Sequence, residues 1–411
     1  MPTDFSVIII GGGLVGLTAA KALADQGILV TVIEAKPPLL NWEDSSYTAQ
    51  VYALNQASLH ILKNLNIWEA ILPQSKTPLY QMDIWDNNYQ GELRFSAMDI
   101  PAPQLGHIVE SRAIIKALWQ SLRDHPCVTL HYPATPKSIT QHESLTQLAL
   151  TDSTLLEADL IIGADGPNSW VRKHVDFTLQ QRPYHHDAMT MVIQSDKPHH
   201  NTALQQFLPD GPIGVLPLHH THQSSIVWST TSSHMDTLLA LPQHDLNQAL
   251  SHALDYRWGH VTALNTPIRF PLHMRHVKHY YNQHVVLIGD AAHTMHPLAG
   301  LGANLGLFDA AVLADCLGKH HKVRSQASLT QALQRYQRWC RPRNTKYLNS
   351  MRFLKDSFSQ TTGLPRQIAS LGLTLINQTP WVKNQLAFHA MTDRGDVPPL
   401  AQLATKTPIN L

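Results

Sequence analysis

The stretch that decides the fold lies near the amino terminus: "VIIIGGGLVGLTAAKALADQGILVTVIEAK", residues 7–36. Its continuous apolar run at 7–10 predicts a buried parallel strand, because both faces of such a strand are covered. Residues 14–26 show helical periodicity, and Gly27 suits the position after the helix end. A second apolar run at 29–33 predicts another strand. The segment therefore predicts a strand–turn–helix–strand unit and an α/β fold.

Three glycines in the turn follow the pattern GxGxxG, and each has a physical task. Gly11 allows the tight turn, Gly13 lets a pyrophosphate approach the backbone, and Gly16 lets the helix pack on the strand. The helix start offers free amides to an anion. Glu34 ends the second strand, where its carboxylate can accept hydrogen bonds from ribose hydroxyls and disfavours a 2'-phosphate. FAD or NAD is therefore expected rather than NADP; the alternative is a tight turn without a ligand.

Two further acid-and-glycine turns follow predicted strands. Asp165 with Gly166 ends the strand in "ADLIIGADGPNSWVRKH" (158–174), and taken alone this reads as an ordinary turn. Asp290 ends the strand at 285–288, where ligands bind in open α/β sheets and where a carboxylate can hold a polyol hydroxyl. Beyond it, Pro297 and Gly300 are expected to turn the backbone. Gly302, Ala303 and Asn304 are expected to open a helix that runs to about 317, and its free amides would face a group that becomes anionic. His293 and His296 are equally compatible with backbone hydrogen bonds and with a cofactor contact.

The bulk composition excludes several classes of protein. The 31 Lys+Arg balance the 30 Asp+Glu, so no basic surface points to nucleic acid. The three cysteines are far apart and indicate a reducing compartment. The 26 histidines show no ligand spacing, so no metal site is predicted. No signal peptide and no membrane-spanning run is seen, so we expect a cytoplasmic protein.

The three turn motifs, in this order, resemble the class A FAD-dependent aromatic hydroxylases. Within these, the ubiquinone-biosynthesis hydroxylases are the nearest match, and the branch resembled is that of the 2-polyprenylphenol 6-hydroxylases. The resemblance covers about residues 7–358 and rests on these segments: "VYALNQASLHILKNLNIW" (51–68), "LGHIVE" (105–110), "QFLPDGPIGVLPL" (206–218), "SIVWS" (225–229) and "GDAAHTMHPLAGLGANLGLFDAA" (289–311).

The resemblance implies a glutathione-reductase-like FAD domain interleaved with a β-sheet substrate domain and followed by a helical region. We expect the FAD domain at 1–73, 102–176 and 270–330. The substrate domain is expected at 74–101 and 177–269, and the helical carboxy-terminal region at 331–411.

The resemblance also implies the cofactor contacts. They fall on Gly11, Gly13, Gly16, Glu34, Ala35, Asp165, Asp290, Pro297, Gly300, Gly302, Ala303 and Asn304. Arg112 opens a predicted helix and is either a phosphate or ribose contact or a solvated surface arginine. Two positions depart from the family pattern: Gln50 stands where an arginine is usual, and Leu301 stands where a glutamine is usual.

The chemistry implied by the resemblance is ring hydroxylation with O2. NADH or NADPH would bind transiently and reduce the flavin, since the chain carries one dinucleotide fingerprint. A C4a-hydroperoxyflavin would then attack an electron-rich phenol that carries a polyprenyl tail. No catalytic base can be named from the sequence. The alternatives are a monooxygenase of another aromatic compound and a flavoprotein scaffold that no longer hydroxylates.

Residues 335–355 carry seven Lys/Arg and no acid, interleaved with apolar side chains. Three readings stay open. The segment is a membrane-surface helix on the inner face of the cytoplasmic membrane, a helix packed on the FAD domain with a solvated basic face, or a docking face for other ubiquinone-biosynthesis proteins.

Overall fold

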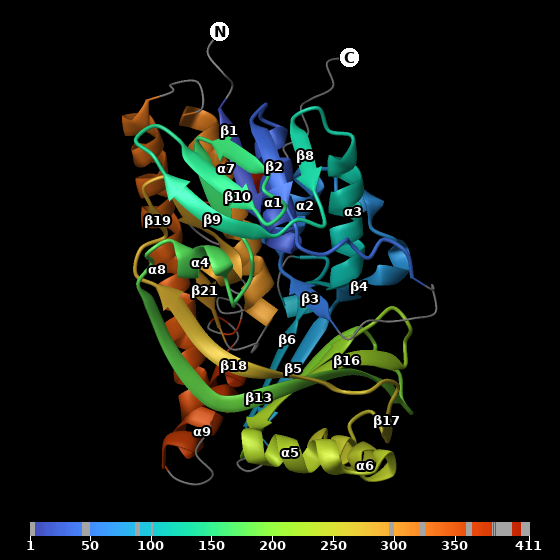
Figure 1. The fold of residues 1–411 in the computed structure, drawn as a ribbon. Coiled ribbons are helices and arrows are strands. Elements are labelled where there is room, and N and C mark those ends of the chain that lie inside the picture. The colour runs from blue at the N-terminus through green and yellow to red at the C-terminus, as the bar shows by residue number, and fades with distance from the viewer. Residues whose placement is uncertain are drawn as a thin grey trace, which may run out of the picture.

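Two large β-sheets lie one above the other in the computed structural model (Figure 1). The structure describes residues 5–42, 50–86, 91–99, 102–295, 300–320, 325–358, 364–379, 381, 383 and 397–403. The upper sheet contains the quoted amino-terminal stretch. The lower sheet carries two helices on its outer side.

The upper sheet is parallel except at one edge, as the apolar strand at 7–10 predicts. Its strands, in spatial order, are β19 (Tyr281–Asn282), β20 (Val285–Leu287), β12 (Leu160–Gly163), β1 (Ser6–Ile10), β2 (Leu29–Ile33) and β8 (Val128–His131). The first strand lies between β12 and β2, with Val7 beside both Leu160 and Val30. β19 alone runs antiparallel to its neighbour. The carboxyl ends of β1, β12 and β20 therefore meet at one edge.

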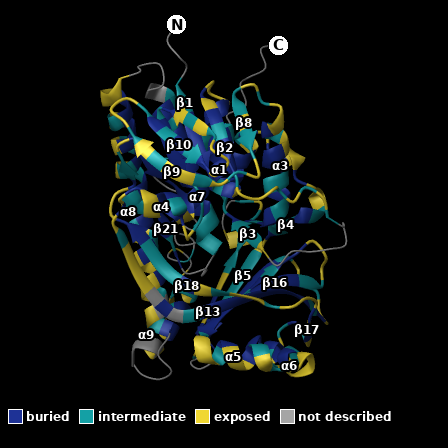
Figure 2. Ribbon diagram, viewed as in Figure 1, coloured by how far each residue is buried: buried dark blue, intermediate teal, exposed yellow. Residues whose placement is uncertain are grey.

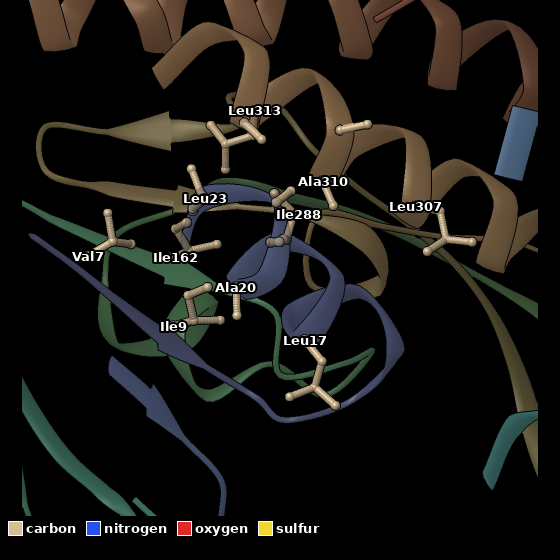
Figure 3. Close-up of a cluster of buried hydrophobic side chains, with 14 of the residues drawn as sticks. Val7, Ile9, Leu17, Ala20, Leu23, Ile162, Ile288, Leu307, Ala310 and Leu313 are labelled. Carbon is tan, nitrogen blue, oxygen red and sulfur yellow. The ribbon is translucent and has the colours of Figure 1, made fainter. Parts of the chain in front are cut away.

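Helices α1 (Leu14–Ala24) and α7 (Leu301–His320) pack on each other beside this sheet. Figure 3 shows Leu17, Ala20 and Leu23 of α1 among strand residues such as Ile162 and residues of α7. α1 ends two residues before the predicted 26, because Gln26 and Gly27 form a turn in which Gly27 has φ +81°. α7 is apolar enough over Leu301–Gly318 to cross a membrane by length and composition, yet 72% of that window is buried. Core packing therefore accounts for its composition.

The lower sheet is mostly antiparallel. It runs β21 (His293–Thr294), β18 (Ile268–Val277), β13 (Leu179–Ser195), β16 (Gln223–Thr231), β15 (Gly211–Pro217), β14 (Thr202–Leu208), β5 (Gln81–Asp86) and β6 (Gly91–Ser96), with β17 (Val261–Ala263) beside β13. α5 (Ser232–Ala240) and α6 (Gln243–Ala253) cover its outer face, with exposed residues turned to solvent (Figure 2). Met189 and Trp228 from the sheet pack with Met235 and Leu250 from these helices. The opposite face of the sheet is thus left for the cavity.

The pairing of β18 bears on the expected domain division. Residues 270–277 fall within the range expected for the FAD domain, yet β18 pairs with β13, with Phe270 beside Ala188 and Val277 beside Leu179. These residues therefore form part of the lower sheet. Because β18 leads directly into the upper sheet through β19 and β20, no break in the sequence marks the change from one sheet to the other.

Two small sheets, several short helices and four 3-10 turns connect the strands of the two large sheets. The sheets are β9 (Pro136–Gln141), β10 (Thr146–Leu150) and β11 (Leu155–Ala158), and β3 (Val51–Leu54), β7 (Gly106–Glu110) and β4 (Lys76–Leu79). The helices are α2 (Gln56–Asn64), α3 (Ser111–Arg123) and α4 (Trp170–His174), with the 3-10 turns η1 (Trp68–Ala70), η2 (Pro73–Ser75), η3 (Ala97–Asp99) and η4 (Gly289–Ala291).

The carboxy-terminal region is helical, as predicted, and packs on both sheets. α8 (Gln326–Phe358) lies along α7, and α9 (Leu364–Gln378) packs on β6 at the lower end of the molecule (Figure 1). The turn η6 (Pro399–Ala401) returns to α2, where Asn64 donates a hydrogen bond to the Leu400 carbonyl at 2.8 Å. The basic segment 335–355 therefore forms part of a packed helix, in line with the second of the three readings.

Candidate functional site

The glycine turn between β1 and α1 has the geometry that a dinucleotide requires. Gly11 has φ +113°, and a Cβ on Gly16 would lie 2.0 Å from the Gly11 carbonyl oxygen. These two glycines are needed for the turn itself. Gly13 differs, since a Cβ there would meet no atom within 4 Å and the residue lines the central cavity. The helix start is therefore open to an anionic group.

Glu34 lies beside this turn at the end of β2. Its carboxylate accepts hydrogen bonds from the Gly12 amide at 2.6 Å and from the Lys36 amide at 3.0 Å. Ala35 follows it at the surface. The position is the one that ribose recognition needs, because the acid and the phosphate-facing turn lie next to each other.

Arg112 takes a different position from the glycine turn. It forms an ion pair with Glu110 at 2.8 Å and lies over the Trp42 ring, with its guanidinium carbon 4.7 Å from the ring centroid. It does not line the central cavity. A contact with FAD stays a prediction for Arg112.

Asp165 ties the turn after β12 to the start of α4. One carboxylate oxygen accepts hydrogen bonds from the Trp170 amide at 2.6 Å and the Val171 amide at 3.0 Å. The other oxygen is buried and has no hydrogen-bond partner in the described part of the chain. Burying an acceptor without a donor is costly, so this oxygen suits a hydroxyl donor such as a ribose or ribityl group.

Arg172 joins the two acid-and-glycine turns, a role that its sequence position did not reveal. Its guanidinium donates to the Pro167 carbonyl at 2.8 Å and to the Ala291 carbonyl at 2.7 Å. The turn after β12 is thus tied to η4, which contains Asp290. The side chain is buried, and burial lowers its pKa from the usual value.

Asp290 sits in η4 at the end of β20, and its side chain is open to the central cavity. Burial within the protein raises the pKa of its carboxyl. Tyr52 of β3 lines the same cavity; burial and then the Asp290 charge raise the pKa of Tyr52 to about 12. Asp290 is therefore an acceptor in a confined polar pocket that suits a polyol hydroxyl.

The start of α7 forms the adjacent wall. Gly300, Gly302, Ala303 and Asn304 all line the cavity, and a Cβ on Gly302 would meet no atom within 4 Å. The Asn304 side chain is fully used within the protein: it accepts from the Asn55 amide and the Ser58 hydroxyl and donates to the Ala53 and Gly300 carbonyls. Any cofactor contact there would involve the backbone. Pro297 and His296 lie outside the described residues.

His293 has a partner that neither reading of its sequence position names. It is 1% exposed, and its Nε2 lies 2.6 Å from the carboxylate of Asp309 in α7. The same carboxylate accepts from the Gly289 amide at 3.1 Å and from the Asn344 side chain of α8 at 3.1 Å. Burial alone would raise the pKa of Asp309, but His293 and these donors outweigh it and lower that pKa. The network fixes the turn beside Asp290 to two helices.

A pH dependence of stability follows from His276, which extends this network through the Tyr280 hydroxyl at 2.9 Å. Burial, and then the nearby His293 and Arg341, lower the pKa of His276 from 6.5 to about 4. In the unfolded chain, His276 therefore binds a proton as the pH falls below 6.5, whereas in the folded chain it stays neutral until about pH 4. We expect the free energy of unfolding to fall by roughly 3 kcal/mol from this group as the pH drops across that window.

Denaturant unfolding at several pH values between 7.5 and 4.5 measures this slope. His276→Gln keeps a hydrogen-bonding side chain without the titration and should flatten the curve, whereas the exposed His252→Gln should not. An unchanged slope in His276→Gln would contradict the assignment. A residual slope of the same sign is expected from His107, whose pKa burial lowers to about 4.

The central cavity has a volume of about 1450 Å³ and joins these walls to the inner face of the lower sheet. The sheet side is mainly apolar; its lining includes Met82, Ile84, Phe95, Leu204, Leu216, Val227, Phe270 and Leu272. Gln205 and Arg275 are polar exceptions on this side. The cavity thus combines acceptors and helix amides at one end with an apolar chamber at the other, and the open glycines and the orphan Asp165 oxygen fit FAD. No cluster that could hold a metal ion occurs among the described residues.

Comparison with known proteins gives one family and one fold. Residues 4–350 match the family described as "FAD binding domain". The 3-demethoxyubiquinol 3-hydroxylase of Escherichia coli (strain K12) is 33% identical over 95% of this chain and 98% of its own length. The ubiquinone hydroxylase UbiL of Rhodospirillum rubrum is 30% identical over 94% of this chain and 89% of its own. The mitochondrial ubiquinone biosynthesis monooxygenase COQ6 of Drosophila melanogaster is 30% identical over 94% of this chain and 90% of its own length.

Solved structures agree on the fold. PqsL, a probable FAD-dependent monooxygenase from Pseudomonas aeruginosa, superposes with a TM-score of 0.76 over 90% of this chain and all of its own, at 19% identity. The p-nitrophenol 4-monooxygenase PnpA from Pseudomonas putida superposes with a TM-score of 0.73 over 96% of this chain and all of its own, at 17% identity. The predicted combination of an FAD domain, a β-sheet domain and a helical region is confirmed.

Proposed function

This chain belongs to the FAD-binding-domain family and, within it, to the ubiquinone-biosynthesis hydroxylases, and from that premise we propose that it hydroxylates the ring of a polyprenylated phenol. It is an FAD-dependent aromatic monooxygenase; one relative is named as a 3-demethoxyubiquinol hydroxylase and another as a ubiquinone biosynthesis monooxygenase. The ring position that we propose is the one hydroxylated by the 2-polyprenylphenol 6-hydroxylase branch.

One observation carries the proposal: the polar end of the central cavity and its apolar chamber are continuous. Asp290, Tyr52 and the start of α7 line one end, and Met82, Phe95 and Leu216 line the other. A phenol held in such a chamber would be screened from water, and a long prenyl tail would gain the free energy of apolar burial. A small polar substrate would gain little from the same lining.

Bound FAD supplies the redox chemistry that activates O2. The chain's own residues bind and orient it. The unpartnered carboxylate oxygen of Asp165 and the Asp290 carboxylate would accept hydrogen bonds from hydroxyls of the cofactor. The amides at the start of α7 would face the flavin edge that gains negative charge on reduction, where a helix start stabilises an anion. NADH or NADPH would dock transiently as the reductant.

Anaerobic stopped-flow reduction of the purified flavoprotein tests the proposal. NADH and NADPH would be compared, each alone, with a short-chain polyprenylphenol, and with the same phenol lacking the tail. We expect the prenylated phenol to speed bleaching by about tenfold over the untailed one, because the apolar chamber binds the tail. Admission of O2 should then give a product heavier by one oxygen atom.

The other outcomes have distinct meanings. A flavin that stays oxidised with both donors and every phenol would overturn the hydroxylase proposal and favour the scaffold. Equal stimulation by tailed and untailed phenols would indicate another aromatic substrate. Mass spectrometric location of the new hydroxyl decides whether the ring position is that of the 6-hydroxylase branch.

A further inference from the structure

Helix α9 presents leucines to solvent on its outer side. Leu371 and Leu375 are four residues apart, so they share one face of the helix, and each is 62% exposed. The opposite face carries Leu373 and Ser370, which are buried against β6 and its neighbours. An amphipathic helix of a globular protein normally turns polar residues outward. The outer leucines therefore need an explanation that core packing does not supply.

Three further apolar side chains on neighbouring segments are also exposed. Trp381, shortly after α9, is 73% exposed. Lys383 forms an ion pair with Asp99 at 2.9 Å, which holds this segment beside η3, where Met98 is 95% exposed. Phe353 belongs to α8, the helix that packs with α9, and is 73% exposed. We call these five residues (Leu371, Leu375, Trp381, Met98 and Phe353) the α9 face.

The α9 face is continuous with the central cavity. Trp381 lines that cavity and is largely open to solvent, so it stands at the rim. Lys346 of α8 is likewise exposed and lines the cavity, so the solvent-accessible part of the cavity wall also carries a cation. Tryptophan and lysine side chains are favoured at the boundary between lipid and water. Isolated exposed apolar residues are ordinary, but a set that includes a tryptophan at the rim of an apolar chamber indicates an interaction surface.

We propose that the α9 face seats this protein on a lipid bilayer and turns the cavity mouth toward the acyl chains. The choice of a bilayer as the occupant rests on the proposed function, because a polyprenylated substrate is dissolved in the bilayer. In this orientation a substrate tail passes from lipid to the apolar chamber without crossing water. Leu371, Leu375 and Trp381 would insert at the level of the headgroups, and Lys346 would face them.

Co-sedimentation with vesicles of phosphatidylcholine and phosphatidylglycerol tests the surface without any turnover. We expect Leu371→Glu/Leu375→Glu to lower the vesicle-bound fraction about tenfold, because two charges replace two inserting side chains. The matched control is Leu155→Glu in β11, where the leucine is 61% exposed. Its sheet lies at the far end of the molecule from α9 (Figure 1), so its binding should equal that of the unmodified protein.

Met98→Glu gives a second test on a separate element, with an expected partial loss of binding. Circular dichroism and FAD content should be unchanged in all variants, and so should turnover of a short-chain phenol in solution. Equal vesicle binding by the α9-face variants and the unmodified protein would overturn the proposal. So would a dimer in solution that the double variant dissociates while vesicle binding persists. A chain that binds vesicles through this face yet hydroxylates nothing would overturn only the proposed function.

Discussion

Replacing Asp290 by alanine is expected to yield a folded protein that loses nearly all of its FAD during purification. The carboxylate is open to the cavity at the end of β20, beside the start of α7. A hydrogen bond to a charged acceptor in such a confined site contributes about 1.5–3 kcal/mol, so the FAD dissociation constant should rise roughly 10- to 100-fold. The ratio of flavin to protein absorbance after gel filtration measures the loss, and fluorescence titration of the apoprotein gives the constant.

The stability of the apoprotein should not fall together with the FAD affinity. Burial raises the pKa of Asp290, which means that the folded apoprotein bears a cost for the charged carboxylate at neutral pH. We therefore expect the melting temperature of the apo Asp290→Ala variant to equal or exceed that of the unmodified apoprotein. Asp290→Asn, which keeps the shape and one acceptor, should retain more FAD than Asp290→Ala. Full yellow colour in the alanine variant would show that this turn does not hold the cofactor.

The parts of the site that could be predicted are those set by short stretches of chain. The residues of β1, the glycine turn and β2 are adjacent in sequence, and parallel strands end at a common edge, so Asp165 and Asp290 could be expected to converge. Long-range geometry could not be read in this way. Arg172 bridges two turns through backbone carbonyls, and nothing about its neighbours in sequence indicates a partner at Ala291. The seventeen-residue strand β13 pairs with β16, β17 and β18, which are all distant along the chain.

Histidines illustrate the same limit. His293 lies in the turn that follows Asp290, where the sequence indicates either a backbone hydrogen bond or a cofactor contact. Its actual partner, Asp309, lies within α7 and is completely buried. Sixteen residues separate the two, and only the packing of α7 on η4 brings them together. A buried acid in an apolar helix is itself a usable signal, because such a group is kept only where it is paired.

The two departures from the family pattern occupy different settings. Leu301 lines the cavity at the start of α7 and packs with the apolar cluster that includes Met295 and Leu348. Its position is apolar on the protein side, so a leucine is accommodated without an unsatisfied polar group. Gln50 is exposed, and its carbonyl accepts a hydrogen bond from the Ser111 amide at 3.1 Å, which joins β3 to the start of α3. Leu301 thus forms part of the cavity wall, whereas Gln50 is not among the residues that line the cavity.

The glycines of the turn provide a second prediction of large effect, because they separate folding from cofactor binding. A Cβ on Gly16 would lie 2.0 Å from the Gly11 carbonyl oxygen, a backbone atom that cannot move without opening the turn. Gly16→Ala should therefore lose more than about 3 kcal/mol of stability, which is visible as insoluble protein or a much lower melting temperature.

Gly13→Ala is the matched variant, since it adds the same methyl group three residues earlier. Its Cβ would meet no protein atom within 4 Å and would point into the space where a pyrophosphate approaches α1. We expect the free energy of unfolding of the Gly13→Ala apoprotein to lie within about 1 kcal/mol of that of the unmodified apoprotein. The FAD affinity should fall by at least tenfold. Melting curves of both apoproteins, followed by FAD titration, measure the two effects separately. If Gly13→Ala destabilised the fold as much as Gly16→Ala, the space beside Gly13 would have to be a packed part of the protein, and the placement of the pyrophosphate there would be wrong.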